Sequence, residues 1–585
     1  MAGTQIPLAA PGVAAGMFPY CVPSQPCWPS LDAWSALNAS VAGRLIRPDG
    51  PLPCVQPQCA DADWRLEQPA GVMFLNFETG QGLIPDDPSR TSTSAPTNSS
   101  SLPIDRTPAY VLEAHTPSDV SSAVSFAREN RLRLRVKSTG HDYLGRSSDE
   151  GSFTLWTRRL NHSRFEREFV PAGAPEGTQG VPALIAGAGS IVRDLYKAAD
   201  EAGVVVTGGV SQTVGAGGGF VLGGGHGPLA PLHGLAADNV LEFTVVTANG
   251  TILRCSPYQN PTLFTALRGG GSSFCVVLET AFKAHVPPAG FVGVFGSFGL
   301  KEGTDASKEE GKQAWREMVK RWTELQPKLS KAGPFAGYTY VRKPEPTPFA
   351  YILPSDNIQL AKDLFTPILE ASAADPNIDI DWEFVETKSW YELWSGPFTN
   401  ALQSLDAVGI PLLLGSRLVP KDVVEQRADD LANFLADSPS PAIVHLGALS
   451  SYDKHLDLAD VEVLAVAGGA VEKEPDFPSS VNSGWRTALL HIDLPISWPS
   501  SAPPSTISSL STYLTSHTLA LGTLASSLGQ PQASYSSESN YYEADWQKVW
   551  YGAENYERLM EAKRAWDPEG VFSARRAVGS EVVGW

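Results

Sequence analysis

The segment 136-VKSTGHDYLGRSS-148 places a histidine, His141, in a loop bounded by two glycines. Gly140 and Gly145 indicate that the backbone turns tightly there or lets another group come close. Taken alone, the segment is typical of a polar loop histidine in a turn. The alternative is that the turn holds the imidazole, which is a nucleophile near neutral pH, against a bound group.

A second candidate for ligand binding is the glycine-dense segment 215-GAGGGFVLGGGHG-227. The dinucleotide fingerprint, the P-loop, the HExxH zinc motif and the G-x-S-x-G nucleophile elbow are all absent from the sequence. Glycine turns instead lie in 138–145, 208–227 and 269–271. Several such loops can surround a pyrophosphate with backbone N–H groups and admit a flat ring system. Plain sheet turns are the other interpretation, but the density of glycine in 215–227 favours ligand contact.

The cysteines indicate an oxidising compartment. Four of them fall among prolines in the first 60 residues, without paired C-x-x-C units or a nearby histidine, so disulfides are favoured over zinc. The remaining two, Cys255 and Cys275, either form a further bridge or stay free, and the sequence does not give the connectivity. The disulfide candidates are therefore Cys21, Cys27, Cys54, Cys59, Cys255 and Cys275.

Four N-x-S/T sequons support secretion, each of them weakly. They begin at Asn38, Asn98, Asn161 and Asn249. A signal-peptide pattern does not precede the cysteines, so secretion implies that such a segment has been removed and that Met1 is a later start. The alternative is that the protein is not exported.

Composition limits the classes of partner. The 585 residues are 42% hydrophobic and 18% charged, with a net charge of −19, which is typical of a large globular protein. An acidic chain is a poor candidate for nucleic acid or an anionic membrane surface. No apolar run approaches the roughly 20 residues that span a bilayer. We expect a small-molecule substrate and a monomer.

The elements that must position these loops follow from periodicity. Residues 109–140 predict strand, helix and strand, with Thr116 as the helix N-cap and alternation over 132–137. A second unit predicts strand 183–189, helix 190–203 and strand 204–209 before the glycine run. Further predicted elements are strands 240–250 and 251–256 and a short helix, turn and strand over 259–285.

The middle of the chain has a different pattern of apolar residues. Apolar strands are predicted at 351–354, 410–419, 442–449 and 487–498, and a helix at 309–329. The pattern indicates an antiparallel sheet with helices on one side. The first 100 residues read as an irregular arm, and the tail contains a helix over 553–568. The predicted class is α+β.

Four separated segments now carry a family resemblance. They are 134–148, 208–227 together with 235–250, 262-TLFTALRGGGSSF-274 and 546-WQKVWYGAENYERLMEAKRAWDPEGVF-572. In this order they resemble the FAD-binding domain and closing element of the berberine-bridge-enzyme-like branch of the vanillyl-alcohol oxidase superfamily. The resemblance covers about 105–285 and 535–572. It implies an arm (1–104), a two-part PCMH-type FAD-binding domain (105–287) closed by the C-terminal segment (531–585), and a substrate domain (288–530).

The resemblance assigns the histidine of the opening loop. In that family the corresponding imidazole is bonded to the 8α-methyl carbon of FAD, which implies the same for His141, and the adjacent backbone would face the pyrophosphate. The implied cofactor-binding residues are Lys137, Ser138, Thr139, Gly140, His141, Asp142, Ser211, Val214, Gly215, Gly217, Gly218, Gly223, Gly224, His226 and Asn239. No metal is expected. Asp142 orients His141 or caps the loop, while turns around His226 and His233 favour structural roles.

Two positions depart from or refine the family pattern. Many members attach FAD a second time through a cysteine, and Ser211 stands at that position here. A serine hydroxyl is not appreciably ionised at neutral pH, so one covalent link is expected. Val214 occupies a position linked to oxygen access and resembles the oxidases, although a packing role would explain it too.

Oxidation of an alcohol by a flavin needs hydride transfer and a base for the hydroxyl proton. By resemblance, the base lies in 535–538, and Glu538 is the first candidate, with Tyr535 and His491 in reserve. A buried carboxylate there is expected to have a raised pKa. A solvated glutamate in a Ser-rich loop is the plain alternative.

Three functions remain open at this point. The first is a secreted oxidase of an alcohol, carbohydrate or phenolic substrate that reduces O2 to H2O2. The second is a flavin dehydrogenase or an oxidative ring-closing biosynthetic enzyme. The third is a catalytically silent flavin-binding protein. Aromatic residues in the substrate domain suit sugars or phenols, but they are ordinary core residues as well.

Overall fold

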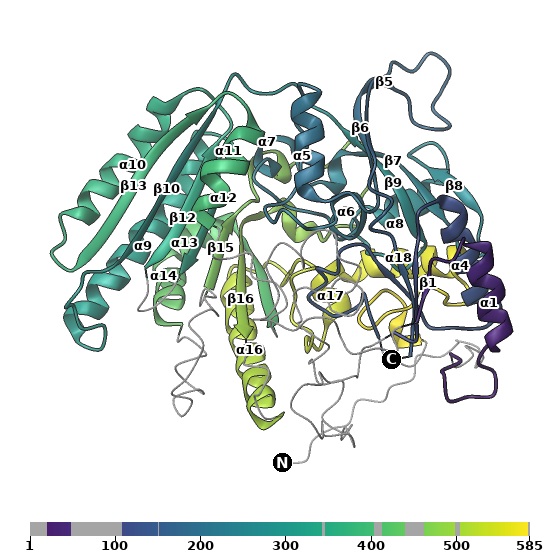
Figure 1. Ribbon diagram of the computed structural model, residues 1–585. Coiled ribbons are helices and arrows are strands. Elements are labelled where there is room, and N and C mark those ends of the chain that lie inside the picture. The colour runs from purple at the N-terminus through teal and green to yellow at the C-terminus, as the bar shows by residue number, and fades with distance from the viewer. Residues whose placement is uncertain are drawn as a thin grey trace.

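Three sheets organise the part of the chain that the computed structural model describes, namely residues 20–47, 108–149, 151–341, 346–402, 412–438, 461–497 and 504–582 (Figure 1). Two of the sheets lie in the N-terminal half, and the third, with helices over one face, lies in the middle of the chain. The C-terminal segment returns to the N-terminal half. This arrangement confirms the predicted α+β class.

The first sheet has the order β1-β2-β4-β3, in which β2, β4 and β3 run parallel. Its strands are β1 (Leu45–Ile46), β2 (Tyr110–Glu113), β3 (Leu134–Lys137) and β4 (Phe153–Trp156). Helix α4 (Pro117–Glu129) makes the crossover between β2 and β3. The Thr116 hydroxyl accepts from the Asp119 N–H and the Asp119 carboxylate from the Thr116 N–H, so the predicted N-cap is a full capping box.

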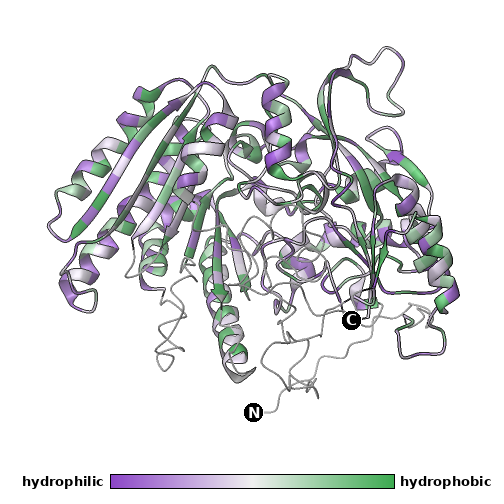
Figure 2. Ribbon diagram, in the orientation of Figure 1, coloured by the Kyte–Doolittle hydropathy of each residue, from purple (hydrophilic) through white to green (hydrophobic). Residues whose placement is uncertain are grey.

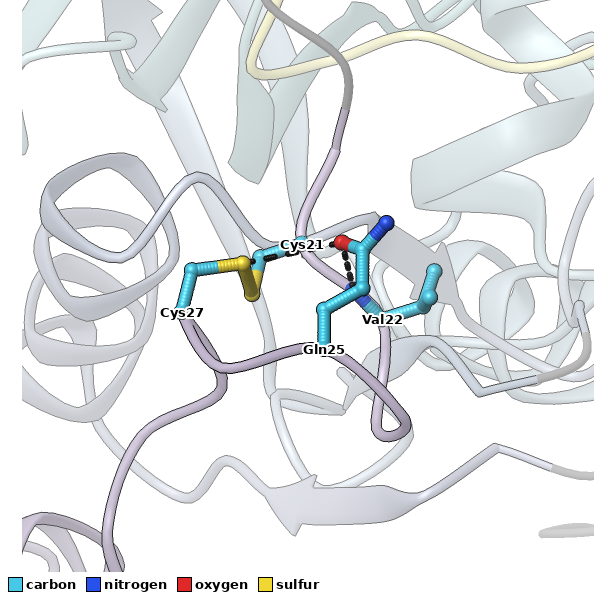
Figure 3. Close-up of a disulfide and its surroundings, with 4 residues drawn as sticks. All are labelled: Cys21, Val22, Gln25 and Cys27. Atoms are coloured by element: carbon cyan, nitrogen blue, oxygen red, sulfur yellow. Dashed lines mark hydrogen bonds between the residues drawn. A yellow bond between two sulfur atoms is a disulfide. The ribbon is translucent and has the colours of Figure 1, made fainter.

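The N-terminal arm is more regular than the sequence suggested. Residues Leu31–Ser40 form helix α1, whose Trp34 ring stacks on Tyr110 with centroids 3.9 Å apart. A disulfide joins Cys21 and Cys27 just before this helix, and Gln25 closes the loop by accepting the Val22 N–H (Figure 3). Cys54 and Cys59 lie outside the described residues.

The second sheet is antiparallel, with the order β5-β6-β9-β7-β8. Its strands are β5 (Ser163–Phe169), β6 (Val181–Gly187), β7 (Val240–Val246), β8 (Ile252–Cys255) and β9 (Val276–Lys283). The helices are α5 (Val192–Glu201) and α8 (Pro261–Leu267). The expected strand 204–209 is wrong, because only Val205 makes a bridge there, to His285. Cys255 and Cys275 are buried and unbridged.

The glycine run does not connect two strands directly but folds into short helical turns. These are η1 (Ala216–Phe220) and α6 (Val221–Gly223), and the short helices α7 (Ala230–His233) and η2 (Ala237–Asn239) follow the run. Gly217 shows why glycine is needed, since a Cβ there would lie 2.3 Å from the carbonyl oxygen of Gly187 on β6. The run is therefore packed tightly onto the end of the second sheet.

The third sheet has seven antiparallel strands in the order β13-β10-β12-β11-β15-β16-β14. They are β10 (Phe291–Leu300), β11 (Ala336–Val341), β12 (Thr347–Leu353), β13 (Ile378–Thr387), β14 (Leu412–Pro420), β15 (Val461–Ala465) and β16 (Ala488–Ser497). The main helices are α9 (Glu309–Ala332), α10 (Ile358–Ala373), α14 (Ala428–Asp437) and α16 (Pro504–Ala525), with shorter turns at α11 (Trp390–Leu393), η3 (Trp394–Phe398), α12 (Thr399–Leu402), α13 (Lys421–Gln426), η5 (Gly469–Glu472) and η6 (Ser483–Arg486). The predicted strand 442–449 lies outside the described residues.

Alternation along the strands gives this sheet two different faces. On one face Thr339 accepts a hydrogen bond from Trp322 of α9, at 2.9 Å, and Val463 and Leu490 pack in the same layer. Tyr338 and the other residues of opposite parity point away from the helices. The alternating character is visible as purple and green bands in Figure 2.

The C-terminal segment is fastened to the N-terminal half by a buried lysine. Its elements are α17 (Trp546–Tyr551), α18 (Ala553–Trp566) and η7 (Ser580–Val582). Lys563 on α18 donates to the carbonyl of Ser273, at 2.6 Å, and pairs with Asp567, also at 2.6 Å. These contacts fasten α18 to the loop that precedes β9, so the chain returns to the N-terminal half after the seven-stranded sheet.

Candidate functional site

A cavity of about 610 Å³ lies where the three parts of the chain meet. One wall comes from the His141 loop and the glycine run, the other from the seven-stranded sheet. The C-terminal loop 535–538 completes the lining. Residues more than 300 positions apart therefore share one site.

The His141 loop has the turn that its glycines predicted. Gly140 and Gly145 adopt positive φ, at 90° and 70°. The His141 Nε2 lies 2.7 Å from the Thr213 hydroxyl, which fixes the ring against the loop that precedes the glycine run. Asp142 pairs with Arg146 instead, at 2.8 Å, so it caps the loop.

The structure divides the predicted cofactor residues into two groups. Lining the cavity are Ser138, Thr139, Gly140, His141, Asp142, Ser211, Val214, Gly215, Gly218, Gly223 and His226. Not in its lining are Lys137, Gly217, Gly224 and Asn239. Asn239 has a structural role, because its amide donates to the carbonyls of His233 and Leu235 and its oxygen lies 2.7 Å from His285 Nε2. Lys137 is fully buried, and burial lowers its pKa to about 7.

The three residues proposed for base chemistry meet where the C-terminal loop joins the glycine run to the seven-stranded sheet. Glu538 Oε2 lies 2.7 Å from His491 Nε2 and 2.9 Å from His226 Nε2. Tyr535 lines the cavity and accepts the N–H of Gly225 at 3.2 Å. His491 is fully buried behind Glu538 and is not part of the lining. His226, expected to be structural, belongs to this cluster.

The expected raised pKa of Glu538 is wrong. Burial alone would raise its pKa, but the charge and hydrogen bonds of His226 and His491 outweigh burial and hold the pKa below its ordinary value. His491 is itself kept from protonating, since burial lowers its pKa. The cluster is therefore a carboxylate that accepts hydrogen bonds from two imidazoles. One ligand atom from each of His226, His491 and Glu538 lies within 4.8 Å of the others, which is close enough to share a metal ion. The hydrogen bonds from the two imidazoles already engage the carboxylate of Glu538.

Sequence reasoning missed two acidic residues of the same wall. Asp493 lines the cavity, and its Oδ1 lies 3.2 Å from His491 Nε2. Burial, together with Glu538 and Glu462, raises the pKa of Asp493 well above its ordinary value. Period-2 alternation would have placed Asp493 on the face of His491 in the predicted strand 487–498. Glu462 lies on β15, a strand that was not predicted.

The residues of the first wall fit FAD. A Cβ on Gly215 would approach the Ser138 hydroxyl to 2.6 Å, so glycine is needed for the close contact between the glycine run and the His141 loop. Without a side chain at this position, the backbone of Gly215 faces the cavity. The buried Ser211 Oγ has no hydrogen-bond partner among the described residues, although it lines the cavity. A polar bound group would satisfy it.

Comparison with known proteins identifies the family. Residues 108–256 match the family described as "FAD binding domain", and residues 526–579 match "Berberine and berberine like". An uncharacterized FAD-linked oxidoreductase of Arthroderma benhamiae is 31% identical, over 96% of this chain and 94% of its own. The chain is a berberine-like FAD-linked oxidoreductase. Its family and enzyme class are thus those expected from the four motifs.

Solved structures agree with the fold. The VAO-type flavoprotein MtVAO615 of Myceliophthora thermophila superposes with a TM-score of 0.76 at 25% identity, covering 97% of this chain and 98% of that one. The glucooligosaccharide oxidase of Acremonium strictum shares the fold with a TM-score of 0.58 at 18% identity, over 81% and 92% of the two chains. The FAD of that oxidase has 6-S-cysteinyl and 8α-N1-histidyl links.

The surface carries the remaining predicted residues. Asn161 and Asn249 are exposed, Asn38 is half-buried with its side-chain oxygen accepting the Leu45 N–H, and Asn98 lies outside the described residues. Among the described residues, none of the helices has the length and apolar character needed to cross a membrane.

Proposed function

We propose that this FAD-linked oxidoreductase is an oxidase of CH–OH groups whose FAD is attached through His141 alone. The observation that supports it most is the cavity, because its lining contains both the His141 loop and a hydrogen-bonded carboxylate, Glu538. Bound FAD would accept a hydride from the substrate carbon and pass the electrons to O2, giving H2O2.

On the flavin side, His141 would hold the FAD through a ring nitrogen. The hydrogen bond between Nε2 and Thr213 orients the imidazole, which lines the cavity. Ser211 cannot supply a thiolate, so a cysteinyl link is not expected. Val214 lines the same wall, and a valine at this position supports the proposal that O2 reaches the flavin.

On the substrate side, Glu538 receives the hydroxyl proton. It is ionised at neutral pH because two imidazoles donate to it, so it needs no prior deprotonation. His226 and His491 hold the carboxylate in place. Tyr535 is protonated, because burial raises the pKa of its hydroxyl, and it acts as a hydrogen-bond donor to the substrate.

Secretion is part of the proposal. It is supported by the Cys21–Cys27 disulfide and by the exposed sequons at Asn161 and Asn249. Digestion of protein secreted by a eukaryotic host with an N-glycosidase should lower its mass. An unchanged mass would argue against glycosylation at these sites.

The test begins with acid precipitation of the purified protein, followed by mass analysis of its peptides. Yellow colour should stay in the pellet, and one peptide containing His141 should carry the added mass of FAD. His141→Ala should release the colour. A panel of alcohols, sugars and phenols is then screened for peroxide. Flavin that is reduced by a substrate but reacts only with artificial acceptors would identify a dehydrogenase instead.

A further inference from the structure

The 209–214 loop, which precedes the glycine run, is fastened to helix α5 through two of its carbonyl groups. The N–H of Val192 donates to the Val214 carbonyl at 3.0 Å, and the N–H of Arg193 donates to the Gln212 carbonyl at 3.1 Å. The N-cap of α5 makes no side-chain hydrogen bond. First-turn N–H groups have no partner inside a helix, so the loop supplies the acceptors that the start of α5 needs.

Two buried side chains hold the other end of the loop. The Tyr196 hydroxyl, on α5, donates to the Gly209 carbonyl at 3.0 Å. The Trp394 indole N–H, on η3, donates to the Val210 carbonyl at 3.1 Å. The two rings meet edge to face, with centroids 5.0 Å apart. A buried donor that loses its acceptor is costly, so each of these bonds resists displacement of the loop.

Trp394 reaches the loop from a distant part of the chain, 184 positions away from Val210. It directly follows α11, whose Trp390 ring packs edge to face on Tyr196. Helices α11 and α5 meet where the N-terminal half adjoins the seven-stranded sheet (Figure 1). The part of the chain that contains this sheet therefore helps to fix a loop of the N-terminal half.

The same loop carries the contact that orients His141. The Thr213 hydroxyl lies 2.7 Å from His141 Nε2. Thr213 stands between the two residues whose carbonyls α5 holds, so these anchors also limit the movement of its hydroxyl. The loop residues that line the cavity are Gly209, Val210, Ser211, Gln212 and Val214.

We propose that Tyr196 and Trp394 are positioning residues for the attachment of FAD at His141. They fix two carbonyls of the 209–214 loop, the loop holds Thr213 in place, and Thr213 holds the imidazole in one orientation. Neither Tyr196 nor Trp394 belongs to the cavity lining, so both act through the loop. The inference rests on the proposed function in taking His141 as the attachment residue.

Attachment depends on this orientation because the reacting atoms must meet in a defined geometry. A bond forms between an imidazole nitrogen and the 8α-methyl carbon of FAD, while a C–H bond of that methyl and the imidazole N–H bond break. The two protons and two electrons that are released reduce the flavin, and O2 reoxidises it to give H2O2. Displacement of the imidazole slows formation of the bond without removing FAD from the cavity.

The test follows attachment separately from binding. The full-length chain is produced in riboflavin-starved cells, and FAD is added to the purified protein. Binding is measured from the quenching of FAD fluorescence, and attachment from the fluorescence of the protein band in a denaturing gel. Tyr196→Phe and Trp394→Phe should each slow attachment about three- to tenfold, while the Kd for FAD stays within about threefold of the wild-type value.

Two buried residues elsewhere in the chain serve as controls. Tyr351→Phe removes a hydroxyl that accepts from the Gln326 amide at 2.8 Å, and Trp315→Phe removes an indole N–H that has no partner among the described residues. Both should leave the attachment rate within about twofold of wild type. Equal slowing in the controls, or wild-type rates for Tyr196→Phe and Trp394→Phe, would overturn the inference. Wild-type protein that binds FAD but attaches none would contradict the proposed function itself, and with it this inference.

A double-mutant cycle tests the route through Thr213. Thr213→Val removes the hydroxyl beside His141 Nε2 and should slow attachment in the wild-type background. If the anchors act through this contact, the same substitution should slow attachment less when Trp394→Phe is already present. Equal slowing by Thr213→Val in both backgrounds would show that Trp394 acts independently of Thr213 and would contradict the proposal. Thermal melts check that each variant is folded.

Discussion

Two imidazole N–H groups approach one oxygen of Glu538, at 2.7 and 2.9 Å, in a residue that the sequence presented as a glutamate in a Ser-rich loop. The segment 535–538 could be named from the family resemblance. Its environment could not, because His226 and His491 come from distant elements and reverse the expected direction of the pKa shift. The expected rise in the pKa of Glu538 rested on burial alone, whereas its contacts with the two histidines lower that pKa.

Glu538→Gln should slow reduction of the flavin by about 10²–10⁴-fold, because the amide cannot accept the hydroxyl proton. The measurement is anaerobic stopped-flow with a substrate found in the peroxide screen. Since the pKa of Glu538 is lowered, the wild-type rate should not fall through loss of this base until the pH drops below the ordinary carboxyl range. A Glu554→Gln variant, exposed on α18, serves as control. A rate within threefold of wild type would exclude Glu538 as the base.

Ser211→Cys should acquire a second bond to FAD, since a thiolate can attack where the hydroxyl does not. Ser211 already lines the cavity with an unpartnered oxygen, so the cysteine sulfur would be placed toward the bound group. Peptide mass analysis of the Ser211→Cys variant should find one FAD bonded to two peptides, the one that contains His141 and the one that contains position 211. Ser211→Ala should keep the single link. Failure of the cysteine variant to cross-link would show that this position does not reach the flavin ring.

At the scale of elements, periodicity predicted most of the helices and strands that it addressed. The capping box at Thr116 and helix α18 followed from local signals, because their hydrogen bonds are formed within a few residues. The strand expected at 204–209 failed for the opposite reason. Its apolar residues are buried under the glycine run and make only one bridge, to His285. A short apolar segment can be a strand or a buried loop, and its sequence does not distinguish the two.

Gly217→Ala tests how the glycine run is seated. The added methyl would come within 2.3 Å of a backbone carbonyl on β6, which cannot move without disturbing the strand, so we expect a loss of roughly 1–3 kcal/mol in the free energy of unfolding and weaker flavin incorporation. Gly219→Ala adds the same methyl where no atom lies within 4 Å. Denaturant unfolding should show little change for Gly219→Ala. Equal losses in the two variants would mean that backbone entropy, not contact, sets the cost.

At the scale of the whole molecule, the cavity exists because three separate parts of the chain converge. Four motifs predicted the wall formed by the His141 loop and the glycine run, because they are local strings with fixed spacing. The wall formed by the seven-stranded sheet could not be predicted in that way. Its row Tyr340–Glu462–Asp493 depends on the register of three strands that are far apart in the sequence. Such register is set by long-range pairing and is not encoded in any one segment.

The stability of the whole molecule should also depend on a stacked histidine pair outside the cavity lining. The rings of His233 and His285 lie 3.9 Å apart and nearly parallel. Burial lowers the pKa of His233 to about 4 and that of His285 to about 3, and Lys283 acts in the same direction. In the unfolded chain each histidine binds a proton as the pH falls through about 6.5. In the folded protein each stays neutral until the pH is much lower. The unfolded state therefore binds more protons below pH 6.5, and stability falls as the pH decreases toward 4.

His285→Gln should flatten this dependence, because glutamine keeps an N–H donor for Asn239 without titrating. We expect the loss of unfolding free energy between pH 7 and pH 5 to shrink by roughly 1–2 kcal/mol relative to the wild type, as measured by urea titration at each pH. His115→Gln, at an exposed position, should leave the dependence unchanged. An unaltered profile for His285→Gln would assign acid sensitivity to the lowered carboxyl groups of Asp119 and Glu279, whose stabilisation is present above their unfolded pKa and is lost at still lower pH.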